Sequence, residues 1–215
     1  MTLCCYLCGA LFPETRDHIP PASFFPEPRP SNLITVPCCE RCNSSYKLDD
    51  EAFRAWISMA DRVSPAGQWI RDQRVFPRTI KGSPKLAQHI RESLSTVTHN
   101  GHEIDLISFP RARVQRFLVR ITKGLLASLY PSIDSSVLTF EADHIILTEA
   151  NREPYEALRD NTVYDCRGDD VFQFRRFVAP STGHGIWLFC FYASSLFAVK
   201  HLPVAGDQPA TTAES

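Results

Sequence analysis

The stretch CYLCGALFPETRDHIPPASFFPEPRPSNLITVPCCERCN, residues 5–43, decides how this chain folds. It begins with the pair Cys5 and Cys8 and ends with the pair Cys39 and Cys42, and 30 residues separate the two CxxC sequences. Two such pairs can supply four thiolates to one tetrahedral Zn²⁺, in a closed structural site without an open coordination position. We therefore predict that Cys5, Cys8, Cys39 and Cys42 bind a structural zinc ion.

The distribution of the cysteines favours metal binding over disulfides. Six of the eight cysteines lie within the first 42 residues, and the sequence there lacks the basic and apolar segments of a secretory signal. We therefore expect a reducing, cytoplasmic compartment. A redox dithiol is the alternative for a CxxC sequence, but it needs only one pair. Cys4 and Cys38 complete no CxxC pair and are expected to be buried or spare thiols.

The composition is that of a globular protein. The chain has 215 residues, of which 44% are hydrophobic and 22% are charged, and these values exclude a disordered, collagenous or coiled-coil protein. No stretch approaches the roughly 18 consecutive apolar residues of a membrane-spanning helix, so we expect no membrane partner.

The charge is distributed unevenly along the chain. Residues 61–130 carry 12 basic and 5 acidic residues, a net charge of +7, although the whole chain has a net charge of −1. Such asymmetry is a pointer to a nucleic-acid partner. A solvated basic face is the alternative, and the charge alone does not decide between the two.

The first sixty residues are expected to form a hairpin followed by a helix. Seven of the sixteen prolines lie between Pro13 and Pro37, and they favour an extended connection between short strands near residues 16–19 and 33–36. Acidic residues 49–51 precede apolar residues at helical spacing from Phe53 to Ala60, which predicts a helix that starts near residue 48.

The remaining residues predict an α+β domain. The strongest helix is expected at about residues 111–130, because its apolar residues recur at helical spacing. A short helix is expected at residues 84–93, and the Asn100-Gly101 sequence predicts a hairpin turn between residues 95–98 and 103–109. Aromatic and β-branched residues at 172–178 and 185–201 predict strands that pack on the long helix. We divide the chain into residues 1–60, residues 61–202 and a flexible tail at residues 203–215.

The long helix carries a basic stripe opposite its apolar face. The stripe consists of Arg113, Arg116, Arg120 and Lys123, at spacings of three, four and three residues. It is either an ordinary solvated face or a surface that holds phosphate groups.

The segment between the CxxC pairs contains side chains suited to catalysis. In a hairpin followed by a helix, a zinc ion bound by both pairs would bring together Asp17, His18, Asn32 and Asn43. A carboxylate, an imidazole and amide oxygens are suited to a hard divalent cation and an activated water.

The combination of CxxC, DHIPP, NL and CxxCN resembles the HNH (ββα-metal) endonuclease family, in the zinc-binding variant whose last His is replaced by Asn. The resemblance covers about residues 5–53, a quarter of the chain. It implies that Asp17 and Asn43 bind one catalytic Mg²⁺ or Mn²⁺ and that His18 is the general base. It also implies that Asn32 fixes the loop and orients the imidazole.

The resemblance implies hydrolysis of DNA, with products that carry 5′-phosphate and 3′-hydroxyl ends. RNA or single-stranded DNA is a possible substrate, and a homodimer is possible. A hypothesis from another class is a zinc-knuckle module that binds nucleic acid or protein without cutting. Such a module needs the four cysteines but not Asp17, His18 or Asn43.

Overall fold

The N-terminal part of the chain forms the expected hairpin and helix. The computed structural model describes residues 3–99, 102–108 and 110–204. Strand β1 (Thr15–Ile19) pairs antiparallel with β2 (Ile34–Cys38), and the short 3₁₀ helix η1 (Ala22–Phe24) lies between them. Two helices follow, α1 (Glu40–Ser45) and α2 (Lys47–Ser58). Acidic residues in the first turn of α2 stabilise its start, and its apolar side chains from Ala52 onward are buried.

A group of helices and a second hairpin follow α2. Helix α3 (Pro65–Ile70) begins at Ser64, whose side chain accepts a hydrogen bond from Gly67 N, and it leads into the π-helix η2 (Arg71–Ile80). Helix α4 (Pro84–Ser93) confirms the short helix expected there. Strands β3 (Leu94–His99) and β4 (His102–Ile107) pair antiparallel, as predicted, although the turn residues 100 and 101 lie outside the described residues.

The C-terminal part is a long helix on a five-stranded antiparallel sheet. Helix α5 (Arg111–Leu129) matches the strongest helix predicted from the sequence, and the 3₁₀ helix η3 (Ser135–Val137) follows it. The strand order of the sheet is β5-β9-β8-β7-β6. These strands are β5 (Leu138–Ile145), β6 (Val163–Arg167), β7 (Phe172–Ala179), β8 (His184–Phe191) and β9 (Ser195–Pro203). The mixed helices and antiparallel sheets confirm the α+β class.

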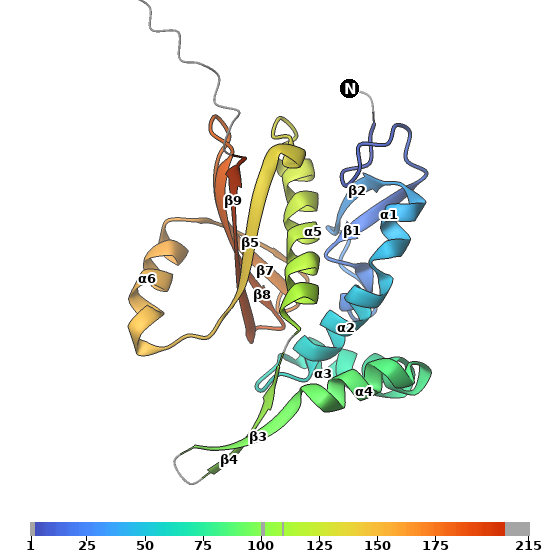
Figure 1. Cartoon of the computed structure of the whole chain (residues 1–215), viewed down its shortest axis with the longest axis vertical. Coiled ribbons are helices and arrows are strands. Elements are labelled where there is room, and N and C mark those ends of the chain that lie inside the picture. The colour runs from blue at the N-terminus through green and yellow to red at the C-terminus, as the bar shows by residue number, and fades with distance from the viewer. Residues whose placement is uncertain (1–2, 100–101, 109, 205–215) are drawn as a thin grey trace, which may run out of the picture.

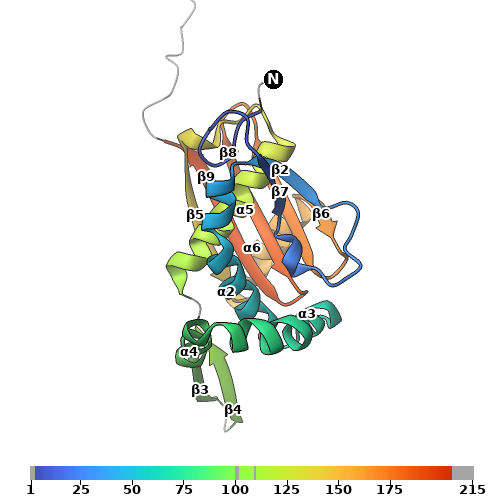
Figure 2. The same ribbon diagram turned by 90° about the vertical axis from the view of Figure 1, so that its right-hand side faces the viewer.

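Helix α5 lies between the N-terminal hairpin and the sheet. Figure 1 shows β1, β2 and α1 on one side of α5 and the five-stranded sheet on the other. Helix α6 (Glu149–Asp160) lies on the side of the sheet away from α5. In the view turned by 90°, α5 crosses in front of the sheet while α3 and α4 lie at its lower end (Figure 2). No helix of the described residues is both long and apolar enough to cross a membrane.

One hydrophobic core joins these layers. The rings of Phe53 on α2 and Phe117 on α5 stack with their centroids 4.0 Å apart. Phe24 from η1 and Phe191 from β8 lie against the same pair. Residues 1–60 and the following residues therefore bury their apolar side chains in one continuous cluster.

Helix α5 approaches the hairpin closely at Gly124. A Cβ atom placed on Gly124 would lie 2.5 Å from Ile19 Cδ1, which is closer than carbon atoms pack. Glycine at this position allows the helix backbone to contact β1, and this contact holds the hairpin against α5.

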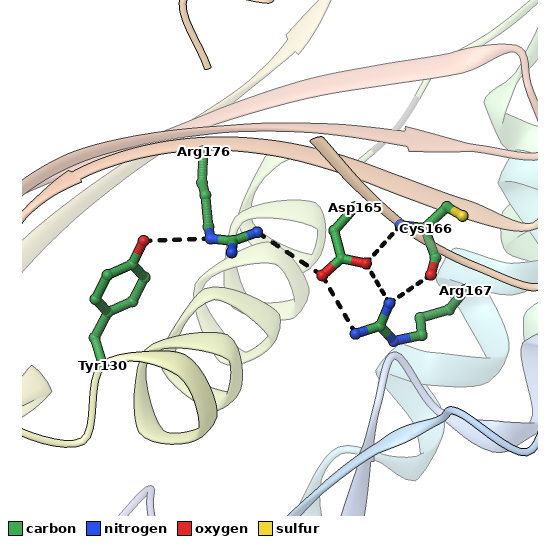
Figure 3. Close-up of polar contacts among 5 residues, drawn as sticks. All are labelled: Tyr130, Asp165, Cys166, Arg167 and Arg176. Atoms are coloured by element: carbon green, nitrogen blue, oxygen red, sulfur yellow. Dashed lines mark hydrogen bonds and ion pairs between the residues drawn. The ribbon is translucent and has the colours of Figure 1, made fainter. Parts of the chain in front are cut away.

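Polar contacts tie the C-terminal end of α5 to the sheet (Figure 3). Arg176 Nε on β7 donates a hydrogen bond to the hydroxyl of Tyr130 over 3.3 Å, and its Nη1 lies 3.9 Å from Asp165 Oδ2 on β6. Asp165 also pairs with Arg167. These contacts fix the two strands at the β6 edge of the sheet relative to α5. The tail predicted from residue 203 lies largely in residues 205–215, which are outside the described residues.

Candidate functional site

The four predicted zinc ligands come together. The Sγ atoms of Cys5, Cys8, Cys39 and Cys42 all lie within 4.8 Å of one another. The Cys8 and Cys39 Sγ atoms are 3.8 Å apart, and a tetrahedral site with Zn–S bonds of about 2.3 Å has S···S separations of about 3.8 Å. The donor type and the spacing therefore fit a structural metal such as zinc. It is the one group of three or more His, Cys, Asp or Glu ligands found among the described residues.

Backbone hydrogen bonds hold the two CxxC turns beside the hairpin. Cys5 N donates to Ala10 O over 2.8 Å, and Gly9, at φ +73°, takes the left-handed conformation that closes this turn. Tyr6 N donates to Pro37 O over 3.1 Å, which attaches the first turn to β2. The second turn runs directly into α1, because Asn43 N donates to Cys39 O over 2.9 Å. The cluster thus connects β2, the N-terminal turn and the start of α1.

The cluster thiols differ in their ionisation, because burial raises the pKa of Cys42 whereas the pKa of Cys5 is lowered. Burial opposes ionisation of Cys5, but hydrogen bonds from the backbone of Cys39, Leu7 and Cys8 outweigh it and lower the pKa of Cys5 to about 6. Burial is the main cause that raises the pKa of Cys38, and the charge of Cys5 raises it further. Cys38 therefore stays a protonated thiol inside the hairpin, and it lies outside the four-cysteine cluster.

Asp17 points inward from β1. It is 5% exposed, and its Oδ2 atom accepts a hydrogen bond of 2.6 Å from the hydroxyl of Tyr6. Arg120 Nε on α5 lies 3.8 Å from the same oxygen. Burial is the main cause that raises the pKa of Tyr6, and the negative charge of Asp17 raises it further. The hydroxyl therefore remains a hydrogen-bond donor.

Arg120 is the cation at the centre of this region. It is 1% exposed, its Nη1 lies 3.0 Å from Asp50 Oδ1, and its guanidinium carbon lies 4.9 Å from the ring centre of Tyr46. Burial raises the pKa of Asp50 to about 6, although the charge of Arg120 opposes the shift. Sequence reasoning missed Asp50, because an acidic residue in the first turn of a helix is common for reasons unrelated to a site.

Asn43 faces the strand that carries Asp17. Its Nδ2 donates a hydrogen bond of 3.2 Å to Thr15 Oγ1. Thr15 and Asp17 are two residues apart on β1 and therefore lie on the same face of the strand. Asn43 and Asp17 thus lie on one side of the hairpin.

His18 and Asn32 lie outside the contact between Asp17 and Asn43. His18 is half-buried, follows Asp17 on β1 and is paired across the hairpin with Thr35. Asn32 is exposed before β2 and lines a cleft with Phe25. Within the described residues no hydrogen bond joins Asn32 to His18, so the role of Asn32 in orienting the imidazole stays a prediction.

The basic stripe of α5 is an internal interface as well as a surface. Arg113 Nε and Arg116 Nη2 lie 3.7 Å and 3.2 Å from the carboxylate of Asp49 on α2. The expectation that Arg120 lies on an exposed face is wrong, because Asp17 and Asp50 pair with it inside the protein. The exposed parts of the stripe line a cleft of about 630 Å³ between α1 and α5, beside Tyr46 and Cys42.

The donor atoms near Asp17 fit a hard divalent cation in type. Both contacts of Asp17 engage Oδ2, and Oδ1 takes part in neither. The carbonyl oxygen of Asn43 is a second oxygen donor on the same side, because only its Nδ2 group is bonded to Thr15. Carboxylate and amide oxygens are the ligands that Mg²⁺ and Mn²⁺ prefer.

Comparisons with models of protein families, with curated proteins and with solved structures found no match to this chain. The functional interpretation therefore rests on the residues and their geometry.

Proposed function

We propose that this protein is a metal-dependent endonuclease of the ββα-metal type that hydrolyses phosphodiester bonds of DNA. The observation that carries the proposal is the position of Asn43. The four-cysteine cluster fixes the start of α1 against the hairpin, and Asn43 thereby reaches the face of β1 that holds Asp17. His18 is the next residue on that strand. The juxtaposition of Asp17 on the hairpin and Asn43 on the helix supports the proposal.

The residues of the chain have distinct roles in the proposed reaction. Asp17 and Asn43 would hold Mg²⁺ or Mn²⁺, which would stabilise the negative charge that develops on the phosphate. The imidazole of His18 accepts the proton of the attacking water, because imidazole is the most common general base. Arg120 is a positioning residue, since its Nε lies 3.8 Å from Asp17 Oδ2 and holds that carboxylate in place.

The surroundings of the site favour a polyanionic substrate. The cleft between α1 and α5 is lined by Arg116, Arg120 and Lys123, and its described lining includes no acidic side chain. Of these three, Arg116 and Lys123 remain accessible to a phosphate backbone, whereas Arg120 is buried. Phosphate contacts of this kind supply affinity without sequence specificity.

A non-catalytic zinc module is the second candidate, and one observation favours it. Arg120 Nε lies 3.8 Å from Asp17 Oδ2 and already supplies a positive charge to this carboxylate. A salt bridge with a purely structural function would have the same geometry. In that case Asp17 holds α5 against the hairpin, and neither His18 nor Asn43 takes part in a reaction.

The two candidates predict opposite results in a plasmid assay. Zinc-loaded wild type and Asn43→Ala are incubated with supercoiled plasmid and Mg²⁺ or Mn²⁺, and with EDTA. We expect nicked and linear products from the wild type with the divalent ion only, and little product from Asn43→Ala. Ser44→Ala is the matched control, because Ser44 is the exposed neighbour of Asn43 on α1. Equal cutting by both variants would contradict the role of Asn43.

A substrate panel separates the remaining alternatives. Duplex DNA, single-stranded DNA and RNA of the same sequence are compared under the same conditions. Cutting of RNA alone would change the substrate but not the site. Binding of any of them without cutting, unaffected by Asn43→Ala, would support the zinc module.

A further inference from the structure

A second basic cleft lies beside the middle of α2. It has a volume of about 600 Å³ and opens between α2, the loop after η1 and the π-helix η2. The cleft is separate from the candidate hydrolytic site, whose Asp17 and Asn43 lie on β1 and α1. Its charged lining consists of Arg29, Arg54, Arg74, Arg78, Glu27 and Glu51. Four arginines face two glutamates there, so the lining has a net charge of +2.

Arg54 is the least expected member of this lining. It is 7% exposed, and Nη2 donates to Thr79 Oγ1 over 3.0 Å. Its Nε is buried without a hydrogen-bond partner, and no ion pair found among the described residues includes Arg54. A buried charge without a paired anion costs free energy. Within the described part of the chain, Glu51 and Asp50 act on this guanidinium only from beyond ion-pair distance.

The neighbouring arginines are only partly neutralised. Glu27 Oε1 lies 2.9 Å from Arg29 and 3.6 Å from Arg74, so one exposed carboxylate serves both guanidinium groups. Arg74 also lies 5.4 Å from the ring centre of Trp69 at the cleft margin, and its Nη1 donates to Ser23 O over 3.3 Å. Arg78 is exposed, and none of the ion pairs between described residues involves it.

We propose that this cleft binds the phosphate group of a nucleotide or of a nucleic-acid backbone. Guanidinium groups present several donors in a planar fork that matches phosphate oxygens. A phosphate between Arg54, Arg74 and Arg78 would supply an anion to Arg54 and Arg78, which form no ion pair among the described residues, and would share Arg74 with Glu27. The volume lies in the range of sites for small ligands. Arg74 and Arg78 stand on a π-helix, a rare element that is frequent at functional sites.

Calorimetric titration of the zinc-loaded protein tests the proposal. Inorganic pyrophosphate, a nucleoside triphosphate and a short DNA duplex are titrated in turn at low salt, without added divalent ion. Because no cleavage is needed, a failure of the proposed nuclease activity does not affect this measurement. We expect saturable binding of at least one probe by the wild type. If only the duplex binds, the phosphate is that of a nucleic-acid backbone; if the small probes bind, it is that of a free nucleotide.

The variants assign the binding to the cleft. Arg78→Ala should weaken binding about tenfold, which is typical of one lost charge-assisted hydrogen bond. Arg91→Ala is the matched control, since Arg91 is an exposed arginine on α4 outside the cleft. Arg54→Met should weaken binding at least as much without lowering the melting temperature. The proposal is overturned if no probe binds to the wild type, or if Arg78→Ala and Arg91→Ala bind equally well.

Discussion

At the scale of single residues, Arg120 determines how the hairpin and α5 fit together. Its guanidinium lies between Asp17 and Asp50, and all three side chains are largely or completely buried. Charged groups are costly to remove from water, and they are tolerated in a core only when they compensate one another. The candidate catalytic carboxylate is therefore stabilised by a residue that lies more than a hundred positions away in the sequence.

Replacing Arg120 by Met should destabilise the protein strongly. The substitution leaves Asp17 and Asp50 without their shared cation, and breaking a buried ion pair on one side costs about 3–5 kcal/mol. Arg116→Ala is the control, because its side chain is 60% exposed and its pairing with Asp49 is worth at most about 1 kcal/mol. Urea denaturation at pH 7 measures the loss in the free energy of unfolding for both variants. Equal losses in the two variants would contradict the central position of Arg120.

The pKa of Asp50 predicts a specific pH dependence. Burial raises that pKa from 3.8 to about 6, so between these pH values the folded protein binds a proton that the unfolded chain has released. The contribution of Asp50 to stability is therefore complete below about pH 4 and is lost as the pH rises through about 6. Between pH 4 and 7 the free energy of unfolding of the wild type should fall by up to about 3 kcal/mol relative to that of Asp50→Asn. Parallel stability curves for the two proteins would contradict the shift.

At the scale of elements, the four-cysteine cluster and the contact between α5 and β1 hold the candidate site together. The cluster fixes the start of α1 beside the hairpin, and Gly124 permits α5 to lie against Ile19. Each of these contacts can be removed by a substitution that has a matched control in the same chain.

Removal of zinc should unfold the region around the hairpin. Zinc binding supplies folding free energy of order 10 kcal/mol in small metal-binding domains. We expect one zinc per chain by metal analysis, and loss of that zinc together with a lower melting temperature in Cys39→Ser. Cys4→Ser is the control, since Cys4 is exposed and lies outside the cluster. Unchanged melting after chelation would mean that the cluster binds no structural metal.

Gly124→Ala should push α5 away from the hairpin. The added methyl group would overlap Ile19, and overpacking of this kind costs about 1–3 kcal/mol, more than the gain of up to about 1 kcal/mol from better helix propensity. At Gly82 an added Cβ would meet nothing within 4 Å, so Gly82→Ala should be neutral or stabilising. Thermal denaturation compares the two. Adding Ile19→Ala to Gly124→Ala should remove the overlap. Equal melting temperatures for Gly124→Ala and Gly82→Ala would contradict the close contact between α5 and β1.

At the scale of the whole molecule, local patterns predicted most elements but not their packing. The CxxC spacing, the proline-rich connection and the apolar periodicity of α5 are local signals, and the elements that they predicted are present. Helix α6 has no buried residue and gave no such signal. The burial of Arg120 could not be predicted, because periodicity shows a basic stripe on α5 but not that acidic residues of α2 cover it. Only the three-dimensional packing places Asp49 and Asp50 against that stripe.

The most direct test of the proposed function is the rate of plasmid nicking by His18→Ala. The wild type and the variant are compared with saturating Mg²⁺ or Mn²⁺, with His89→Ala as the control, because His89 is exposed on α4. Loss of a general base should lower the rate about 10²- to 10⁴-fold while the melting temperature is unchanged. His89→Ala should cut as the wild type does. Equal rates for His18→Ala and the wild type, or no metal-dependent cutting by the wild type, would contradict the assignment of this site as a nuclease.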